Sequence, residues 1–256
     1  MKKISQTKTT KLSLTYPTRF MAISNVALPW LISTTLFFLI LGMILVIRSP
    51  DDYQQGMTVK IMYIHVPFAW LSTFCYIMMS AAALGNLIWS HYLTDIALKC
   101  SAPIGAIFTA LALMTGALWG RPTWGTWWVW DARLTSVLIL FFIYLAIIAL
   151  SHAFDNPIKA ARATAIVTLV GLINIPIIKF SVNWWNTLHQ QSSLLRSGGI
   201  AIDRIMLWPL IIMALCFLFM FIVLHLMAMQ NEIIFRQIQS LQIKATHHTK
   251  NQDSSA

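Results

Sequence analysis

The sequence is poor in charge, and above all in acidic residues. Only 10% of its 256 residues are charged, with 8 Asp or Glu against 18 Lys or Arg, while 58% are hydrophobic. A soluble globular domain carries about a quarter charged residues, so this composition excludes one. It also excludes an intrinsically disordered chain, which requires low hydrophobicity. The class that remains is an integral membrane protein, embedded in a lipid bilayer.

Cysteine is scarce as well. The chain has three, Cys75, Cys100 and Cys216, and no two of them form a C-x-x-C pair. A thiol redox motif is therefore excluded. All three lie in or beside apolar runs, which is typical of small buried residues.

Six runs are apolar and long enough to cross a bilayer, which takes about 20 residues. They cover residues 29–47, 66–89, 102–119, 134–152, 164–180 and 205–228. Strand-period alternation is missing from them, and a bilayer tolerates no irregular backbone facing lipid. The sequence therefore predicts an all-α membrane protein with six transmembrane helices. Pro176 in the fifth run predicts a kink there, because proline removes one helical hydrogen bond.

The net charge of +10 indicates how these spans are oriented. The first 28 residues hold five basic residues and no acidic one, and basic flanks favour the cytoplasmic side. An even number of spans puts both ends on one side, so residues 1–28 and 229–256 are predicted to be cytoplasmic tails. Residues 1–256 then form a single membrane domain, and the excess of positive charge is no reason to expect a nucleic-acid partner.

The loops predicted on the opposite, outer side are the longer ones, at 48–65, 120–133 and 181–204. Long loops on one face usually carry function. The second contains most of an unusual cluster: five of the eleven tryptophans fall between residues 119 and 130. They are Trp119, Trp124, Trp127, Trp128 and Trp130. Single tryptophans near span ends anchor a helix at the membrane interface, but that role does not explain five in twelve residues.

The spacing of the cluster indicates a ligand-binding surface. If the segment is helical, Trp124, Trp127, Trp128 and Asp131 share one face. They would form an aromatic shelf on which a large planar apolar ligand could stack. Asp131 also fits a second interpretation, as the N-cap of the fourth span, and the two roles are compatible.

Histidines point to the same end of the molecule. Of seven, only His65 and His189 fall in the predicted outer loops, one on each side of the tryptophan-rich loop. Two imidazoles beside a planar aromatic shelf suit the axial positions of a haem iron, so both are predicted metal ligands. With no C-x-x-C pair, the predicted cofactor is non-covalent, bis-His haem b. Outer cations, among them Arg133, could pair with its propionates.

The same residues resemble a known family. The run from Trp124 to Arg133, Trp-Gly-Thr-Trp-Trp-Val-Trp-Asp-Ala-Arg, is similar to the WWD signature of haem-handling proteins in cytochrome c biogenesis. Residues 60–67 and 181–190 resemble the two outer haem-ligand loops of the CcmC family within that group. The resemblance covers all six spans.

This resemblance implies a multi-pass protein of the bacterial inner membrane with its tryptophan-rich loop, residues 120–133, in the periplasm. It implies His65 and His189 as axial ligands. Residues of the signature that would present haem are Trp124, Trp127, Trp128, Trp130 and Asp131, to which we add the flanking Trp119 and Arg133 as candidates. Family members work with the subunits CcmA, CcmB and CcmD, and load haem onto the chaperone CcmE.

The predicted function is therefore haem binding and delivery during maturation of c-type cytochromes, with no catalytic residue and no enzyme activity. The alternative is a haem-attaching cytochrome c synthetase, or lyase, of the same wider family. Those relatives are longer and have further histidines within the membrane, so a six-span chain with two outer histidines favours delivery.

Overall fold

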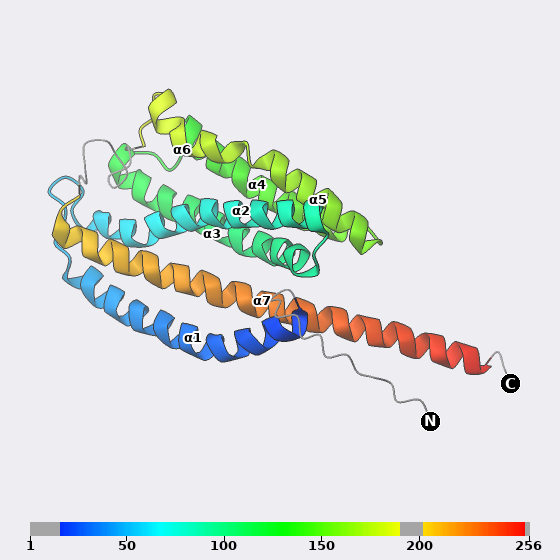
Figure 1. The fold of residues 1–256 in the computed structure, drawn as a ribbon. Coiled ribbons are helices and arrows are strands. Elements are labelled where there is room, and N and C mark those ends of the chain that lie inside the picture. Colours follow the sequence, from blue (N-terminus) through cyan, green and yellow to red (C-terminus); the bar gives the residue numbers. More distant parts are fainter. Residues whose placement is uncertain (1–15, 190–201, 254–256) are drawn as a thin grey trace.

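The structure is a computed structural model, and it describes residues 16–189 and 202–253, with side chains to residue 246. It is helical (Figure 1), and the described residues contain no β-strand. In order, the elements are α1 (Pro17–Arg48), the 3-10 turn η1 (Met57–Ile61), α2 (Met62–Trp89), α3 (Tyr92–Trp124), α4 (Ala132–His152), α5 (Pro157–Gly171), α6 (Asn174–Trp184) and α7 (Arg204–Asp253). Six segments are long and apolar enough to cross a membrane, so the predicted fold class is confirmed.

Several helices are longer than the apolar runs from which they were predicted. α1 begins at Pro17 rather than residue 29, and α3 covers Tyr92–Trp124 rather than 102–119. Apolarity marks only the part of a helix inside the hydrocarbon, which is about 30 Å thick. Backbone hydrogen bonding continues beyond it, so part of the predicted N-terminal tail and the first five residues of loop 120–133 are helical.

The helix of the fifth span is interrupted just before Pro176, where a kink was predicted. α5 ends at Gly171 and α6 starts at Asn174. Pro176 has no N–H for the Leu172 carbonyl, which instead accepts from the Ile175 amide at 3.1 Å, and the helix is interrupted one turn before the proline. The predicted kink is confirmed. At the break, the side-chain amide nitrogen of Asn174 donates to the Ser136 carbonyl of α4 at 2.9 Å, which braces α6 against α4.

The core lies between α2, α3, α4 and α5. Its centre is a pair of buried tyrosines, Tyr76 and Tyr144, whose rings meet edge to face at 5.3 Å. Their hydroxyls donate to the carbonyls of Thr168 and Ser72, so burial leaves neither hydroxyl without a partner. α1 lies outside this core and packs along α7 (Figure 1).

The bundle has two distinct ends. α1 begins and α7 ends toward one of them, and the segments 49–61 and 125–131 lie at the other (Figure 1). The longest element, α7, has 50 residues and extends beyond the other helices. The tryptophan-rich segment therefore lies at one end of the bundle and the start of α1 at the other, as predicted. Which end faces the cytoplasm stays a prediction from the basic residues.

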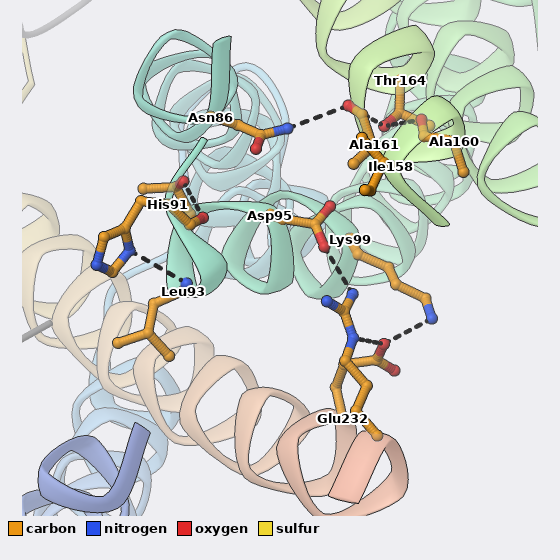
Figure 2. Close-up of polar contacts among 12 residues, drawn as sticks. Asn86, His91, Leu93, Asp95, Lys99, Ile158, Ala160, Ala161, Thr164 and Glu232 are labelled. Carbon is orange, nitrogen blue, oxygen red and sulfur yellow. Dashed lines mark hydrogen bonds and ion pairs between the residues drawn. The ribbon is translucent and has the colours of Figure 1, made fainter. Parts of the chain in front are cut away.

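A network of charges closes the end where α1 begins. Glu232 of α7 accepts from Lys99 of α3 at 2.7 Å and from Arg236 at 2.8 Å, and Arg236 also pairs with Asp95 at 2.7 Å (Figure 2). All four side chains are more than two-thirds covered. Opposite charges therefore join α3 to α7 beside the apolar contacts that Ile96 and Cys100 make with Met229 and Ile233.

This network is expected to contribute measurably to stability. A double-mutant cycle with Asp95→Ala and Arg236→Ala, followed by unfolding in detergent micelles, should give a coupling free energy of about 1 kcal/mol or more, as found for partly buried neighbours in one network. The matched control is the Asp51–Lys60 ion pair, 3.4 Å long with Asp51 half exposed, for which about 0–1 kcal/mol is typical. Equal coupling energies for the two pairs would contradict the assignment.

Candidate functional site

The site is built on the last three turns of α3. This helix runs through Trp119 and Trp124 and ends at Gly125, whose φ of +77° lies in the left-handed region. Glycine adopts that conformation without steric cost and commonly terminates helices in this way. The Gly125 amide donates to the Arg121 carbonyl, and the Arg121 guanidinium donates to the Gly125 carbonyl. Both contacts hold the chain where it leaves the helix.

The tryptophan-rich segment after Gly125 is not a helix. Residues 125–131 are irregular, so the predicted helical face of Trp124, Trp127, Trp128 and Asp131 is wrong. The physical reason is local: Gly125 ends α3 in a left-handed conformation, and Asp131 starts α4 in an extended one, which leaves no room for another helical turn between them.

The tryptophans of this segment differ in exposure. Trp127 is 56% exposed and Trp130 76% exposed, whereas Trp128 is half buried and packs edge to face on Trp130 at 5.4 Å. The indole Nε1 of Trp128 is buried, and no acceptor for it exists among the described residues. An unpaired buried N–H is costly, and a ligand carrying oxygen atoms would relieve that cost.

His65 lies in the first turn of α2 rather than at the end of a loop, and it faces α3. Its Nδ1 is 3.1 Å from the Thr115 hydroxyl, and its ring meets Trp119 edge to face at 5.7 Å. Between those two residues, Gly116 makes room for the imidazole: a Cβ atom there would lie 2.9 Å from His65 Cε1. His65 is thus seated against one face of α3.

His189, from the segment after α6, contacts the same helix one turn further on. Its ring lies 6.2 Å from that of Trp124, and the Trp124 indole in turn lies against Gly120, where a Cβ would approach it to 2.9 Å. His65 is within electrostatic range of both His189 and Arg133. The two histidines, 124 positions apart, are therefore brought to one end of α3 together with Trp119 and Trp124.

Asp131 links two parts of the site. One carboxylate oxygen accepts from the Leu134 amide at 2.8 Å and caps α4, which confirms the capping interpretation. The other accepts from the Thr187 hydroxyl, and the same hydroxyl oxygen accepts from the His189 amide at 3.0 Å. Asp131 is 8% exposed. Its carboxylate thus connects the start of α4 to the backbone of His189.

Arg133, predicted to contact the ligand, donates to the Ile178 carbonyl of α6 at 2.9 Å. This bond uses one of its five N–H donors, so the side chain both braces α6 and keeps donors for an anion. Among the other outer cations, Lys60 pairs with Asp51, and the Arg121 guanidinium lies over the Trp127 ring at 5.9 Å.

Three polar residues of the site were not predicted. They are Thr115, Thr187 and Gln55, whose side chain accepts from Trp119 Nε1 at 2.8 Å. A signal did exist for Thr115, because it stands with Gly116 one turn before Trp119 in an otherwise apolar run. Gln55 and Thr187 lie in polar loops, where nothing in the sequence distinguishes them from their neighbours.

Comparison with known proteins gives consistent matches over nearly the whole chain. Residues 10–244 match the family model described as "Heme exporter protein C". A protein of that name from Bradyrhizobium diazoefficiens is 58% identical over 234 residues, which cover 91% of this chain and 89% of the relative. One from Escherichia coli K12 is 45% identical, covering 88% and 91% respectively. A putative cytochrome c biosynthesis ccmC-like mitochondrial protein of Marchantia polymorpha is 49% identical over 67% of this chain and 72% of its own length.

Proposed function

This chain belongs to the haem exporter protein C family, and from that premise we propose that it binds haem through His65 and His189 and delivers it to the chaperone CcmE. Members of the family handle haem in cytochrome c maturation as membrane transport components and not as enzymes. The chain is accordingly a multi-pass protein of the bacterial inner membrane. The two axial ligands, the non-covalent binding of haem b and the acceptor CcmE are the finer points of the proposal.

One observation carries the proposal. Two histidines from distant parts of the chain pack against consecutive turns of α3, each in contact with a tryptophan of the same helix. Neutral imidazole is a common ligand of haem iron, and indoles offer flat apolar faces for a macrocycle.

The remaining parts of the site have assigned roles in this proposal. The proposed binding surface consists of the indoles beside the two histidines, Trp119 and Trp124, and of Trp128 in the loop. The exposed indoles of Trp127 and Trp130 add apolar surface at the outer end, where a haem edge would be accessible to CcmE. Arg133 supplies donors for a propionate. Asp131 holds the loop that carries His189. CcmA, CcmB and CcmD are the proposed partner subunits, and the tryptophan-rich loop is placed in the periplasm because of the basic N-terminal segment.

Titration of the purified detergent-solubilised protein with haem tests the binding step. We expect saturable binding and the absorption spectrum of six-coordinate bis-His haem. Trp127→Ala and Trp130→Ala should each weaken haem binding about fivefold, since an aromatic contact is worth about 1 kcal/mol. Trp30→Ala is the matched control, because Trp30 is 75% exposed on α1, outside the site. Equal effects at all three positions would show that the loop tryptophans do not contact haem.

Mixing the haem-loaded protein with purified CcmE tests the delivery step. We expect haem to move to CcmE faster than it is lost to a haem-binding protein that does not belong to the pathway, such as serum albumin. Equal rates to the two acceptors would leave binding intact and contradict specific delivery.

A further inference from the structure

We propose that Thr115 is a positioning residue for His65: its hydroxyl oxygen holds the imidazole in the tautomer protonated at Nδ1 and thereby leaves the Nε2 lone pair free for a metal. The proposal rests on the function proposed above, in which His65 ligates haem iron. It concerns a residue in the interior of α3, which precedes the haem-presenting signature that starts at Trp124.

The hydrogen bonds of Thr115 determine the direction of the contact. A threonine hydroxyl has one proton. In this structure the Thr115 hydroxyl lies 2.6 Å from the Leu111 carbonyl, four residues earlier in α3, and a carbonyl can only accept. The proton is therefore used within the helix. At its 3.1 Å contact with His65 Nδ1, the Thr115 oxygen must accept, so Nδ1 carries the hydrogen.

The contact with Thr115 determines which nitrogen can ligate. A neutral imidazole has only one N–H. Since that hydrogen is directed at the Thr115 oxygen, Nε2 is the nitrogen that can donate an electron pair to a metal.

The seat for the ring is formed by one face of α3. Ala112, Thr115, Gly116 and Trp119 follow the i, i+3, i+4, i+7 spacing that lines up side chains along a helix. Thr115 bonds Nδ1, the bare Cα of Gly116 lets the ring approach, and Trp119 contacts it edge to face. Because α3 is a continuous helix here, the orientation of the imidazole is fixed by the packing of α2 on α3.

The chemistry of the contact predicts measurable consequences. A ligating histidine that donates its other N–H to an oxygen is a stronger electron donor, and loss of such an outer-shell partner typically costs 10–100-fold in metal affinity. Stronger donation also favours ferric over ferrous iron. Loss of the Thr115 oxygen should therefore weaken haem binding and raise the midpoint potential of the bound haem.

The test compares Thr115→Val with Thr115→Ser in the full-length protein. Valine keeps the shape and removes the oxygen, and we expect haem affinity about tenfold lower, at the small end of the range usual for an outer-shell partner. The midpoint potential should rise. Serine keeps the oxygen and should restore both values. Thr109→Val is the matched control, because buried Thr109 makes the same bond to a carbonyl four residues earlier, that of Gly105 at 2.6 Å.

A measurement without haem tests the tautomer itself. In the haem-free protein labelled with 15N-histidine, the His65 signal, assigned by its loss in His65→Ala, should show a hydrogen on Nδ1. In Thr115→Val the population of that tautomer should fall, and in Thr109→Val it should not change.

The outcomes separate this proposal from the function on which it rests. If Thr115→Val leaves the tautomer, the affinity and the potential unchanged while His65→Ala weakens haem binding and changes the haem spectrum, the positioning role is wrong and the ligand assignment stands. If His65→Ala keeps the wild-type haem spectrum, the ligand assignment itself is wrong, and the proposal for Thr115 falls with it.

Discussion

Replacing His65 and His189 together with alanine is expected to abolish haem binding by the purified protein. Each substitution removes one nitrogen ligand of the iron, and the apolar contacts with tryptophan alone give no coordination. Loss of an outer-shell partner already costs 10–100-fold in metal affinity, so loss of both direct ligands should cost more than about 100-fold. Haem titration followed by absorption spectroscopy measures this effect.

The single variants distinguish two ligands from one. His65→Ala and His189→Ala should each retain weakened binding, with a spectrum that has lost its six-coordinate bis-His character. His152→Ala is the control, because His152 is an exposed residue at the end of α4, at the opposite end of the bundle. If the double variant keeps the wild-type haem content and spectrum, the bis-His site does not exist.

The fold could be predicted from the sequence because the bilayer restricts it so strongly. An apolar run without strand periodicity can only be a helix, and Pro176 predicted the break between α5 and α6. The edges were less predictable. Tyr92 to Ser101 is too polar to count as a span, yet its backbone continues α3, because helix formation depends on hydrogen bonds and not on hydropathy.

The local conformation of the tryptophan-rich segment was predicted wrongly for an identifiable reason. The spacing of Trp124, Trp127 and Trp128 fits a helical face, but the same run contains Gly125 and Asp131, a helix stop and a helix start. Both terminal signals prevailed in the structure over the tryptophan spacing. Side-chain periodicity over seven residues is weak evidence where terminal signals fall inside the run.

The polar contacts of the site could not be predicted, since each depends on how the helices pack. Thr115 is 50 residues from His65, and Thr187 is 56 residues from Asp131. The histidines and tryptophans proposed to contact haem were chosen from the sequence, which also predicted that they lie at one end of the protein. Only the structure identifies the polar residues that hold these side chains in place.

Asp131→Ala should weaken haem binding about tenfold or more, an effect of the size seen for other outer-shell residues, even though both carboxylate oxygens are occupied by hydrogen bonds within the protein. The variant removes the cap of α4, which typically costs 0.5–2 kcal/mol of stability. It also removes the acceptor for Thr187, whose oxygen holds the His189 amide. Haem titration and unfolding of the same preparation measure the two losses separately.

Two further variants decide which loss affects haem. Asn156→Ala removes a comparable cap, since the Asn156 side chain accepts from the Ile158 and Lys159 amides at the start of α5, and it should lower stability without affecting haem binding. Thr187→Val leaves the cap of α4 in place and removes only the link to His189, so it should weaken haem binding nearly as much as Asp131→Ala with a smaller loss of stability. A contrary result would be that Thr187→Val binds haem like the wild type and Asp131→Ala does not. The effect of the carboxylate on haem binding would then not depend on its link to His189. If Asn156→Ala weakens binding as much as Asp131→Ala, helix stability alone accounts for the effect of the aspartate.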